Sequence, residues 1–245
     1  MFSLKFERIV WVMLALSMGL YGTDYLLFGQ WREIGLGFLG NLAFLPIYVL
    51  FVTLMIERVL KARERDALRQ KLNMVIGVFF SEIGTVLLRD GFGFVRECEA
   101  LRSRMKVSGQ WNDAEFRAAG EFLKGQPLRV DSRNGDLQEL RDFLVSKRQF
   151  MLGLLENPNL LEHDDFTELL WAVFHLVEEL EHRADLSHLP ETDLDHLSGD
   201  IKRAYTHLLT QWLSYMQHLK NDYPYLFSLA VRTNPLDPEA KVEVS

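Results

Sequence analysis

Two long apolar runs lie close together at the start of the chain, and they constrain its folding more than any other feature. Residues 9–23 carry no charge, and after Asp24 the apolar character resumes through Phe28. Residues 34–56 form a second run of 23 residues without Asp, Glu, Lys or Arg. About 20 mostly apolar helical residues span the hydrocarbon core of a bilayer, so both runs are long enough. We predict two transmembrane helices, about 9–28 and 34–56, in an N-terminal hairpin of residues 1–62.

Basic residues predict the orientation of this hairpin. Lys5 and Arg8 precede the first span, and the turn at residues 29–33 contains one arginine. The second span is followed by a basic segment that begins with Arg58, Lys61, Arg63 and Arg65. Cytoplasmic segments beside membrane spans carry an excess of Lys and Arg. We therefore predict that both the N-terminus and the C-terminal domain lie in the cytoplasm, at the inner or plasma membrane. These four basic residues should contact anionic lipid headgroups, an attraction of about 1 kcal/mol for each.

An acidic residue lies toward the outer end of the first span. Asp24 follows the uncharged run directly. An ionisable group within a membrane span indicates a candidate functional site. It would then line an ion path or pair with a basic group of a neighbouring helix. The alternative is that the helix ends near Thr23, so that the Asp24 carboxylate reaches the outer headgroups.

The second span contains a polar residue, a proline and several glycines. Asn41 and Pro46 lie in its interior. Its outer end contains Gly35, Gly37 and Gly40. Small residues and a buried amide favour close packing between membrane helices, either within the hairpin or in a homo-oligomer. The alternative is a polar constriction or kink in a pore.

The remainder of the chain has the pattern of a cytosolic all-α bundle over residues 63–222. Apolar residues recur at helical spacing, and no alternating segment of useful length precedes the tail. The second span is expected to continue as the first helix of the bundle, with residues 72–88 in the core. Further helices are expected at about 95–105, 113–123, 137–154, 164–183 and 193–220. The tail, residues 223–245, should dock through its apolar first part on the bundle or on a neighbouring subunit, and should fray from residue 234 onward.

The charge of the bundle argues against binding to nucleic acid. Residues 1–62 hold five of the chain's 27 basic groups and four of its 34 acidic groups. The remaining 22 basic and 30 acidic groups give the rest of the chain a net charge of −8. A nucleic-acid-binding domain typically presents an excess of Lys and Arg. We therefore expect no nucleic acid as a partner. The partners that we expect are the lipid bilayer and a cytosolic protein.

The histidines suggest one weak metal hypothesis. Glu179 and His182 have the E-x-x-H spacing that di-iron bundle proteins use on paired helices. No second such motif lies on another long helix, so a solvated polar face that also includes Glu168 and His175 is the simpler interpretation. His196, His207 and His218 lie 11 residues apart on one helix face, about 16 Å from one another along the axis. They cannot share one ion within a monomer, and we expect no cofactor.

No motif identifies a family or a catalytic mechanism, and three functions remain open. The first is a membrane-anchored, non-enzymatic helical module that acts as a scaffold or binds a cytosolic partner. The second is an oligomeric channel in which the hairpins surround a pore and the bundle assembles or gates it. The third is a metal-dependent enzyme built on the bundle. Two spanning helices bury little surface alone, so homo-oligomers are expected under the first two.

Overall fold

The computed structural model describes residues 2–29, 31–96, 98–125, 127–157, 160 and 163–243. Over these residues the chain is almost entirely helical, and its only pairing of extended backbone is an isolated bridge between Val95 and Val130. The predicted all-α class is therefore confirmed. The chain divides into two compact units, Met1–Asp66 and Ala67–Ser245. The division falls four residues later than the boundary expected after residue 62.

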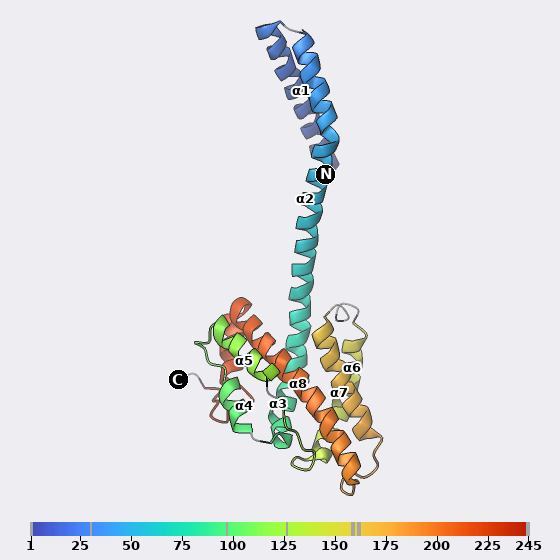
Figure 1. Cartoon of the computed structure of the whole chain (residues 1–245), viewed down its shortest axis with the longest axis vertical. Coiled ribbons are helices and arrows are strands. Elements are labelled where there is room, and N and C mark those ends of the chain that lie inside the picture. Colours follow the sequence, from blue (N-terminus) through green and yellow to red (C-terminus); the bar gives the residue numbers. More distant parts are fainter. Residues whose placement is uncertain are drawn as a thin grey trace. The chain divides into compact units, whose positions relative to one another are not determined.

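The first unit contains two long helices joined by a tight turn (Figure 1). Helix α1 spans Phe2–Phe28, and helix α2 spans Trp31–Phe79, so α2 contributes residues to both units. Gly29 has a φ of 66° and its N–H donates to the Tyr25 carbonyl at 2.9 Å. This left-handed conformation ends α1, and glycine adopts it without a Cβ clash. Near the turn the Tyr21 and Phe38 rings meet edge to face, with centroids 6.1 Å apart.

The second unit is a bundle of helices that begins with the last part of α2. The elements that follow it are η1 (Phe80–Gly84), α3 (Thr85–Gly91), η2 (Phe92–Phe94), α4 (Cys98–Met105), α5 (Asp113–Gly125), α6 (Leu137–Leu155), α7 (Asp164–Glu181), α8 (Glu191–Asp222) and α9 (Pro224–Arg232). Helix α8 is central, because α7, α5, α9 and α3 all pack against it. Figure 1 shows α6 and α7 on one side of α8 and α5 on the other.

Side-chain caps explain where several of these helices begin. The Asn112 side chain accepts from the N–H of Ala114 and Glu115, while the Glu115 carboxylate accepts from the N–H of Asn112. This reciprocal capping box starts α5. Asp136 accepts from the Glu139 N–H at 2.8 Å and starts α6. The sequence predicted α5 and α6 to within about two residues at each end.

The segment 72–88 forms part of the core, as predicted. Phe79, Ile83 and Leu88 are fully buried, and the Phe79 ring meets Phe166 of α7 edge to face at 5.3 Å. The α-helix widens to a π-turn over Phe80–Gly84 before it resumes as α3. The Thr85 hydroxyl donates to the Phe80 carbonyl at 2.8 Å and so satisfies a carbonyl in this turn. A π-turn of this kind is often found beside functional sites.

The C-terminal tail is more ordered than we expected. Its apolar first part forms α9, which packs against α8 through the buried Phe227. The expectation that the chain frays from residue 234 onward was wrong, because Asn234 and Leu236 are buried. The Asn234 amide lies 3.4 Å from the Met105 carbonyl, and Lys106 pairs with Asp237 at 3.1 Å. These contacts join the tail to the end of α4, while residues 244 and 245 lie outside the described residues.

Candidate functional site

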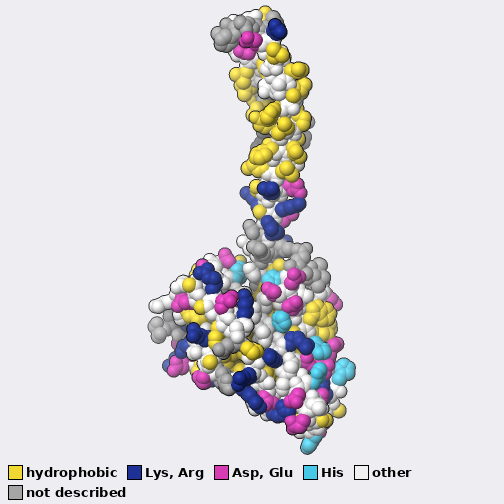
Figure 2. Space-filling model, viewed as in Figure 1, with side chains coloured by type: hydrophobic (Ala, Val, Ile, Leu, Met, Phe, Trp, Pro, Cys, Tyr) yellow, Lys and Arg dark blue, Asp and Glu magenta, His cyan; other side chains and the backbone are white. Residues whose placement is uncertain are grey.

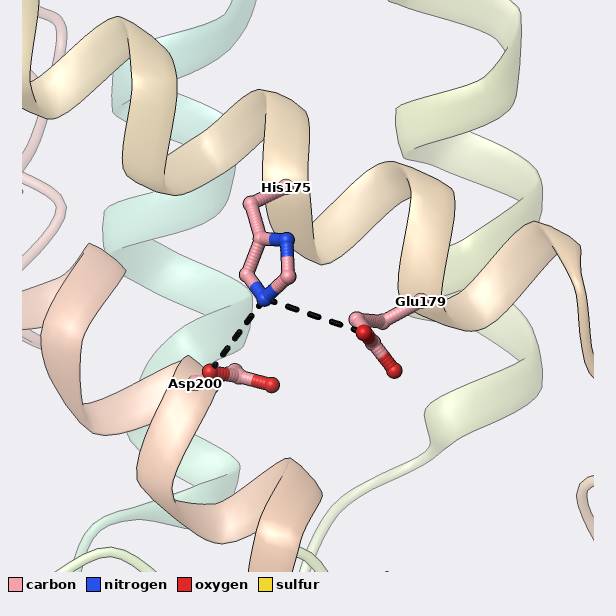
Figure 3. A group of neighbouring side chains, drawn as sticks. All are labelled: His175, Glu179 and Asp200. Carbon is pink, nitrogen blue, oxygen red and sulfur yellow. Dashed lines mark ion pairs between the residues drawn. The ribbon is translucent and has the colours of Figure 1, made fainter.

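Two histidines and two carboxylates meet between α7 and α8. His175 and Glu179 lie four residues apart on α7, and His196 and Asp200 lie four residues apart on α8. Residues at this spacing share one face of a helix. Because a short connector reverses the chain between the packed helices, each histidine lies opposite the carboxylate of the other helix. We call these four residues the quartet, and Figure 3 shows three of them converging.

Each carboxylate of the quartet lies near both imidazoles. The Nε2 atom of His175 lies 3.7 Å from Glu179 Oε1 and 3.7 Å from Asp200 Oδ1. The Nε2 atom of His196 lies 3.5 Å from Glu179 Oε2 and 3.2 Å from Asp200 Oδ2. One ligand atom each from His175, Glu179 and Asp200 lie within 4.8 Å of one another. This arrangement has the donor types and the spacing of a small cation site.

Asp200 is the buried member of the quartet. Its side chain is only 3% exposed, whereas those of His175 and His196 are 43% and 53% exposed. Asp200 Oδ2 is buried and accepts no hydrogen bond from the protein, although it lies near the His196 ring. A buried carboxylate oxygen without a partner is unfavourable, because it loses hydration without replacement. The quartet is therefore closed on the Asp200 side and open to solvent on the histidine side.

Two arginines contact the outer edges of the quartet. Arg183 donates to Glu179 Oε2 at 2.8 Å and to both oxygens of Asp193, and Arg203 lies 3.2 Å from Asp200 Oδ1. The hydrogen bond from Arg183 is the main cause that lowers the pKa of Glu179 below its ordinary value. The same arginine lowers the pKa of Asp193. Glu179 is therefore ionised at neutral pH and available as an anionic ligand.

The E-x-x-H spacing that drew attention to Glu179 and His182 does not describe this site. The Nδ1 atom of His182 lies 2.7 Å from the Glu178 carbonyl in the last turn of α7, and its side chain is exposed. Among the described residues, the group that places one ligand atom each within 4.8 Å is His175, Glu179 and Asp200; His182 is not in it, and His196 joins it only through its contacts with the second oxygens of the two carboxylates. The pattern that builds the quartet is H-x-x-x-[DE], present as His175–Glu179 on α7 and as His196–Asp200 on α8; His218 and Asp222 repeat it farther along α8. That repeated pattern was the signal that the sequence analysis missed.

The other histidines of the α8 strip have separate partners. The Nδ1 atom of His207 lies 3.8 Å from Glu168 of α7. The Nδ1 atom of His218 lies 2.7 Å from Asp222 and 3.1 Å from the Asn73 amide. The polar face of α7 thus pairs with α8 at Glu168 as well as at Glu179. It is not purely a solvated face.

The polar residues of the predicted spans all lie inside helices. Helix α1 continues through Asp24 to Phe28, so it ends five residues beyond Thr23. Asn41 and Pro46 lie within α2, and all three side chains are exposed within this chain. Open space surrounds the three glycines of the second span, Gly35, Gly37 and Gly40. A Cβ atom added to any of them would meet no other atom within 4 Å.

One helical stretch of the described residues is long and apolar enough to cross a membrane. It begins at Arg32, and its most apolar 18-residue window has a mean hydropathy of 2.1 with none of the window buried. Figure 2 shows the apolar side chains of this first unit as an almost continuous yellow surface, followed by a band of charged side chains. Along the chain the apolar run is followed by Arg58, Lys61, Arg63 and Arg65, all of them exposed. Lys61 pairs with Glu57 at 2.7 Å.

A mostly apolar groove of about 570 Å³ lies in the second unit between α2, η1, α8 and α9. Tyr225 and Met74 at its edge are 71% and 59% exposed. The ring of Tyr215, which also lines it, stacks on Phe80 of the π-turn at 5.1 Å. Burial of Tyr215 raises the pKa of its phenol, so that it remains protonated at neutral pH. The groove is the largest apolar feature among those described for this unit.

Two family models together match most of the chain. Residues 4–60 match the model described as "MJ1433, N-terminal helical domain", and residues 68–232 match "Uncharacterized protein MJ1433, C-terminal helical domain". The chain belongs to the MJ1433 family. The gap between the two matches contains the division after Asp66 that the contacts within the structure define.

A relative in Methanocaldococcus jannaschii supports this assignment. The "Uncharacterized protein MJ1433" of that organism is 46% identical over 224 residues, which cover 91% of this chain and 89% of the relative. Both domains of the family are therefore present in this chain. No solved structure matches.

Proposed function

We propose that the chain is a membrane-anchored, non-enzymatic helical module, with its bundle at the cytoplasmic face of the inner or plasma membrane. The observation that carries this proposal is the surface of α2. Every residue from 35 to 60 is exposed within the chain, although most of residues 34–56 are apolar. Monomeric soluble proteins rarely expose continuous apolar patches above a few hundred Å². A bilayer covers such a helix on all sides, and α1 would supply the second span.

The orientation rests on the basic band after the second span. An excess of Lys and Arg beside a span marks its cytoplasmic end. The second span is followed by Arg58, Lys61, Arg63 and Arg65, and their exposure leaves them available to lipid headgroups. This pattern supports a cytoplasmic position for the acidic bundle, where a cytosolic protein is its expected partner. Small residues without neighbours on α2 support lateral contact between copies of the chain.

Labelling of introduced cysteines tests the topology. The chain has one cysteine, Cys98, which is first replaced by Ser. We expect an impermeant maleimide to label Glu33→Cys in intact cells and to label Gln110→Cys only after the membrane is permeabilised. The two variants have matched exposed sites on opposite sides of the proposed membrane. Labelling of Gln110→Cys in intact cells would show that the bundle lies on the outer side of the membrane. Recovery of the protein in the soluble fraction would refute the membrane anchor.

The apolar groove of the bundle supports the partner-binding part of the proposal. It combines exposed aromatic and aliphatic side chains with a few polar lining residues, a composition typical of protein interfaces. A photo-crosslinking residue at Tyr225 in the full-length protein should form a specific cross-link to a cytosolic protein in intact cells. The same residue at Gln110, which is exposed and far along the chain from the groove, is the control. Cross-links that are absent at Tyr225, or equal at both positions, count against partner binding there.

The position of Asp24 favours a second candidate function, an oligomeric channel. Helix α1 carries this carboxylate one turn before its end, where it would face a shared pore or a neighbouring helix. The channel hypothesis predicts that Asp24→Asn combined with Asn41→Leu changes ion conductance in reconstituted liposomes. Conductance that is unchanged by the double substitution would remove the reason for this candidate.

A further inference from the structure

We propose that the quartet of His175, Glu179, His196 and Asp200 binds a divalent transition-metal ion, for which Zn²⁺ is the appropriate probe. The proposal is independent of the membrane anchor, because all four residues lie in the helical bundle. Two imidazole nitrogens favour Zn²⁺ and its neighbours in the first transition series over Mg²⁺ and Ca²⁺, which prefer oxygen ligands. Two carboxylates complete a donor set with two negative charges, enough to neutralise the ion.

One ligand atom each from His175, Glu179 and Asp200 lie within 4.8 Å of one another, and His196 Nε2 lies beside the second oxygen of each carboxylate. The four imidazole-to-carboxylate separations run from 3.2 to 3.7 Å. Zinc with bonds of about 2.1 Å places its ligand atoms about 3.4 Å apart in a tetrahedron. Three of the four separations exceed the upper limit of about 3.2 Å for an N–H···O hydrogen bond, and the separation of 3.2 Å between His196 and Asp200 lies at that limit. Both imidazoles therefore face both carboxylates across one small space.

Asp200 supplies a second and independent observation. Its Oδ2 atom is buried, has no hydrogen-bond partner, and lies 3.2 Å from His196 Nε2. When the His196 imidazole is neutral and its Nε2 carries no proton, the lone pairs of His196 Nε2 and Asp200 Oδ2 face each other. A cation between them replaces this unfavourable contact with two coordinate bonds. The exposed sides of His175 and His196 provide the path by which an ion enters.

The surrounding charges suit this role. Arg183 and Arg203 each contact one carboxylate of the quartet, and Arg183 is also paired with Asp193. With both histidines neutral, these groups and the two carboxylates of the quartet have a net charge of −1, which a divalent ion changes to +1. Hydrogen bonds of this kind orient metal-binding carboxylates in known sites. Arg203 is 57% exposed, so it can give up its contact with Asp200 when the ion binds.

Zinc titration of the full-length protein tests the site. The chain is purified in detergent without a histidine tag, stripped with a chelator and titrated with Zn²⁺ against a chromophoric competitor. We expect one Zn²⁺ per chain, and a melting temperature that rises with Zn²⁺ but not with equal Mg²⁺, because ligands that bind only the folded state stabilise it. Absence of stoichiometric Zn²⁺ overturns the proposal.

Variants separate this site from nonspecific binding to surface histidines. Asp200→Asn and His196→Ala should each weaken Zn²⁺ binding by at least about 100-fold, more than is typical for second-shell changes. His207→Ala is the matched control, because His207 lies on the same face of α8 but pairs with Glu168. It should bind Zn²⁺ as the wild type does. Equal losses in His207→Ala and His196→Ala overturn the proposal.

Folding of the variants is checked without metal by circular dichroism. Asn has the size of Asp, so Asp200→Asn should retain wild-type helical content while it loses the Zn²⁺-dependent rise in melting temperature. His196 is more than half exposed, so His196→Ala provides the same test if the buried substitution disturbs packing. A Zn²⁺-dependent rise that persists unchanged in both variants overturns the proposal.

Discussion

Two lysines in the middle of α2 should prevent the chain from entering the membrane. Leu45 is the centre of the run 34–56, and Val49 lies one turn later on the same face. On insertion scales Leu and Val contribute about −0.3 to −0.6 kcal/mol each, and Lys costs about 2.5–3.5 kcal/mol at the helix centre. Each substitution is therefore unfavourable by about 3–4 kcal/mol, and the pair by about 6–8 kcal/mol.

This change is comparable to the whole driving force of the span. Residues 34–56 contain 14 Leu, Ile, Phe or Val residues, which together favour insertion by about 4–8 kcal/mol on the same scale. The side chains of Leu45 and Val49 are 53% and 57% exposed within the chain. Their replacement therefore removes no core contact, and the melting temperature of the helical bundle should not change.

Alkaline extraction of cell membranes measures the outcome. We expect the wild type in the membrane pellet and the Leu45→Lys/Val49→Lys variant in the extract. Val145→Lys/Trp171→Lys is the matched control, since both residues are exposed apolar positions of the bundle. It should remain in the pellet. A double-lysine α2 variant that resists extraction as the wild type does would refute the assignment of α2 as a span.

Three further predictions concern the stability of the bundle, measured by chemical denaturation of the full-length protein. Phe79→Ala should destabilise it by about 3–5 kcal/mol, because Phe79 is fully buried and its ring meets Phe80 and Phe166; a loss below 1 kcal/mol would contradict this packing. Tyr205→Phe should cost about 1 kcal/mol, because the buried Tyr205 hydroxyl donates to the Leu88 carbonyl at 2.7 Å; an unchanged midpoint would argue against that bond. Hydrogen bonds from Arg133 lower the pKa of Asp131 to about 2, so ionised Asp131 stabilises the fold above its ordinary pKa near 4. That contribution is lost as the pH falls toward 2. Asp131→Asn should be less stable than the wild type at pH 7, with the difference shrinking below pH 4; a difference independent of pH would contradict the prediction.

The helices could be predicted from local sequence because their causes are local. The apolar periodicity of α6, α7 and α8 extends over many turns, and Asn112 begins α5 through hydrogen bonds to residues within three positions. The charge-free run 34–56 likewise requires no knowledge of distant residues.

The quartet and the tail could not be predicted in the same way. Glu179 and His182 share a motif along the chain, but His182 lies in the last turn beside the Glu178 carbonyl. The partners of Glu179 on α8 lie 17 and 21 residues later, and they depend on the register in which the two helices pack. In the tail, Leu236 is buried at the end of a segment whose prolines and charges are typical of a frayed terminus.

Hydropathy and helical periodicity belong to contiguous residues, so the amino-acid sequence was sufficient for the helical class, the apolar segment and the limits of most helices. Residues such as His175 and Asp200 are separated along the chain and are brought together by the packing of α7 on α8. Their proximity follows from how two apolar faces interlock, which is a property of the assembled core. The folded bundle therefore established which carboxylates and histidines meet, and which oxygen of Asp200 was left without a hydrogen bond.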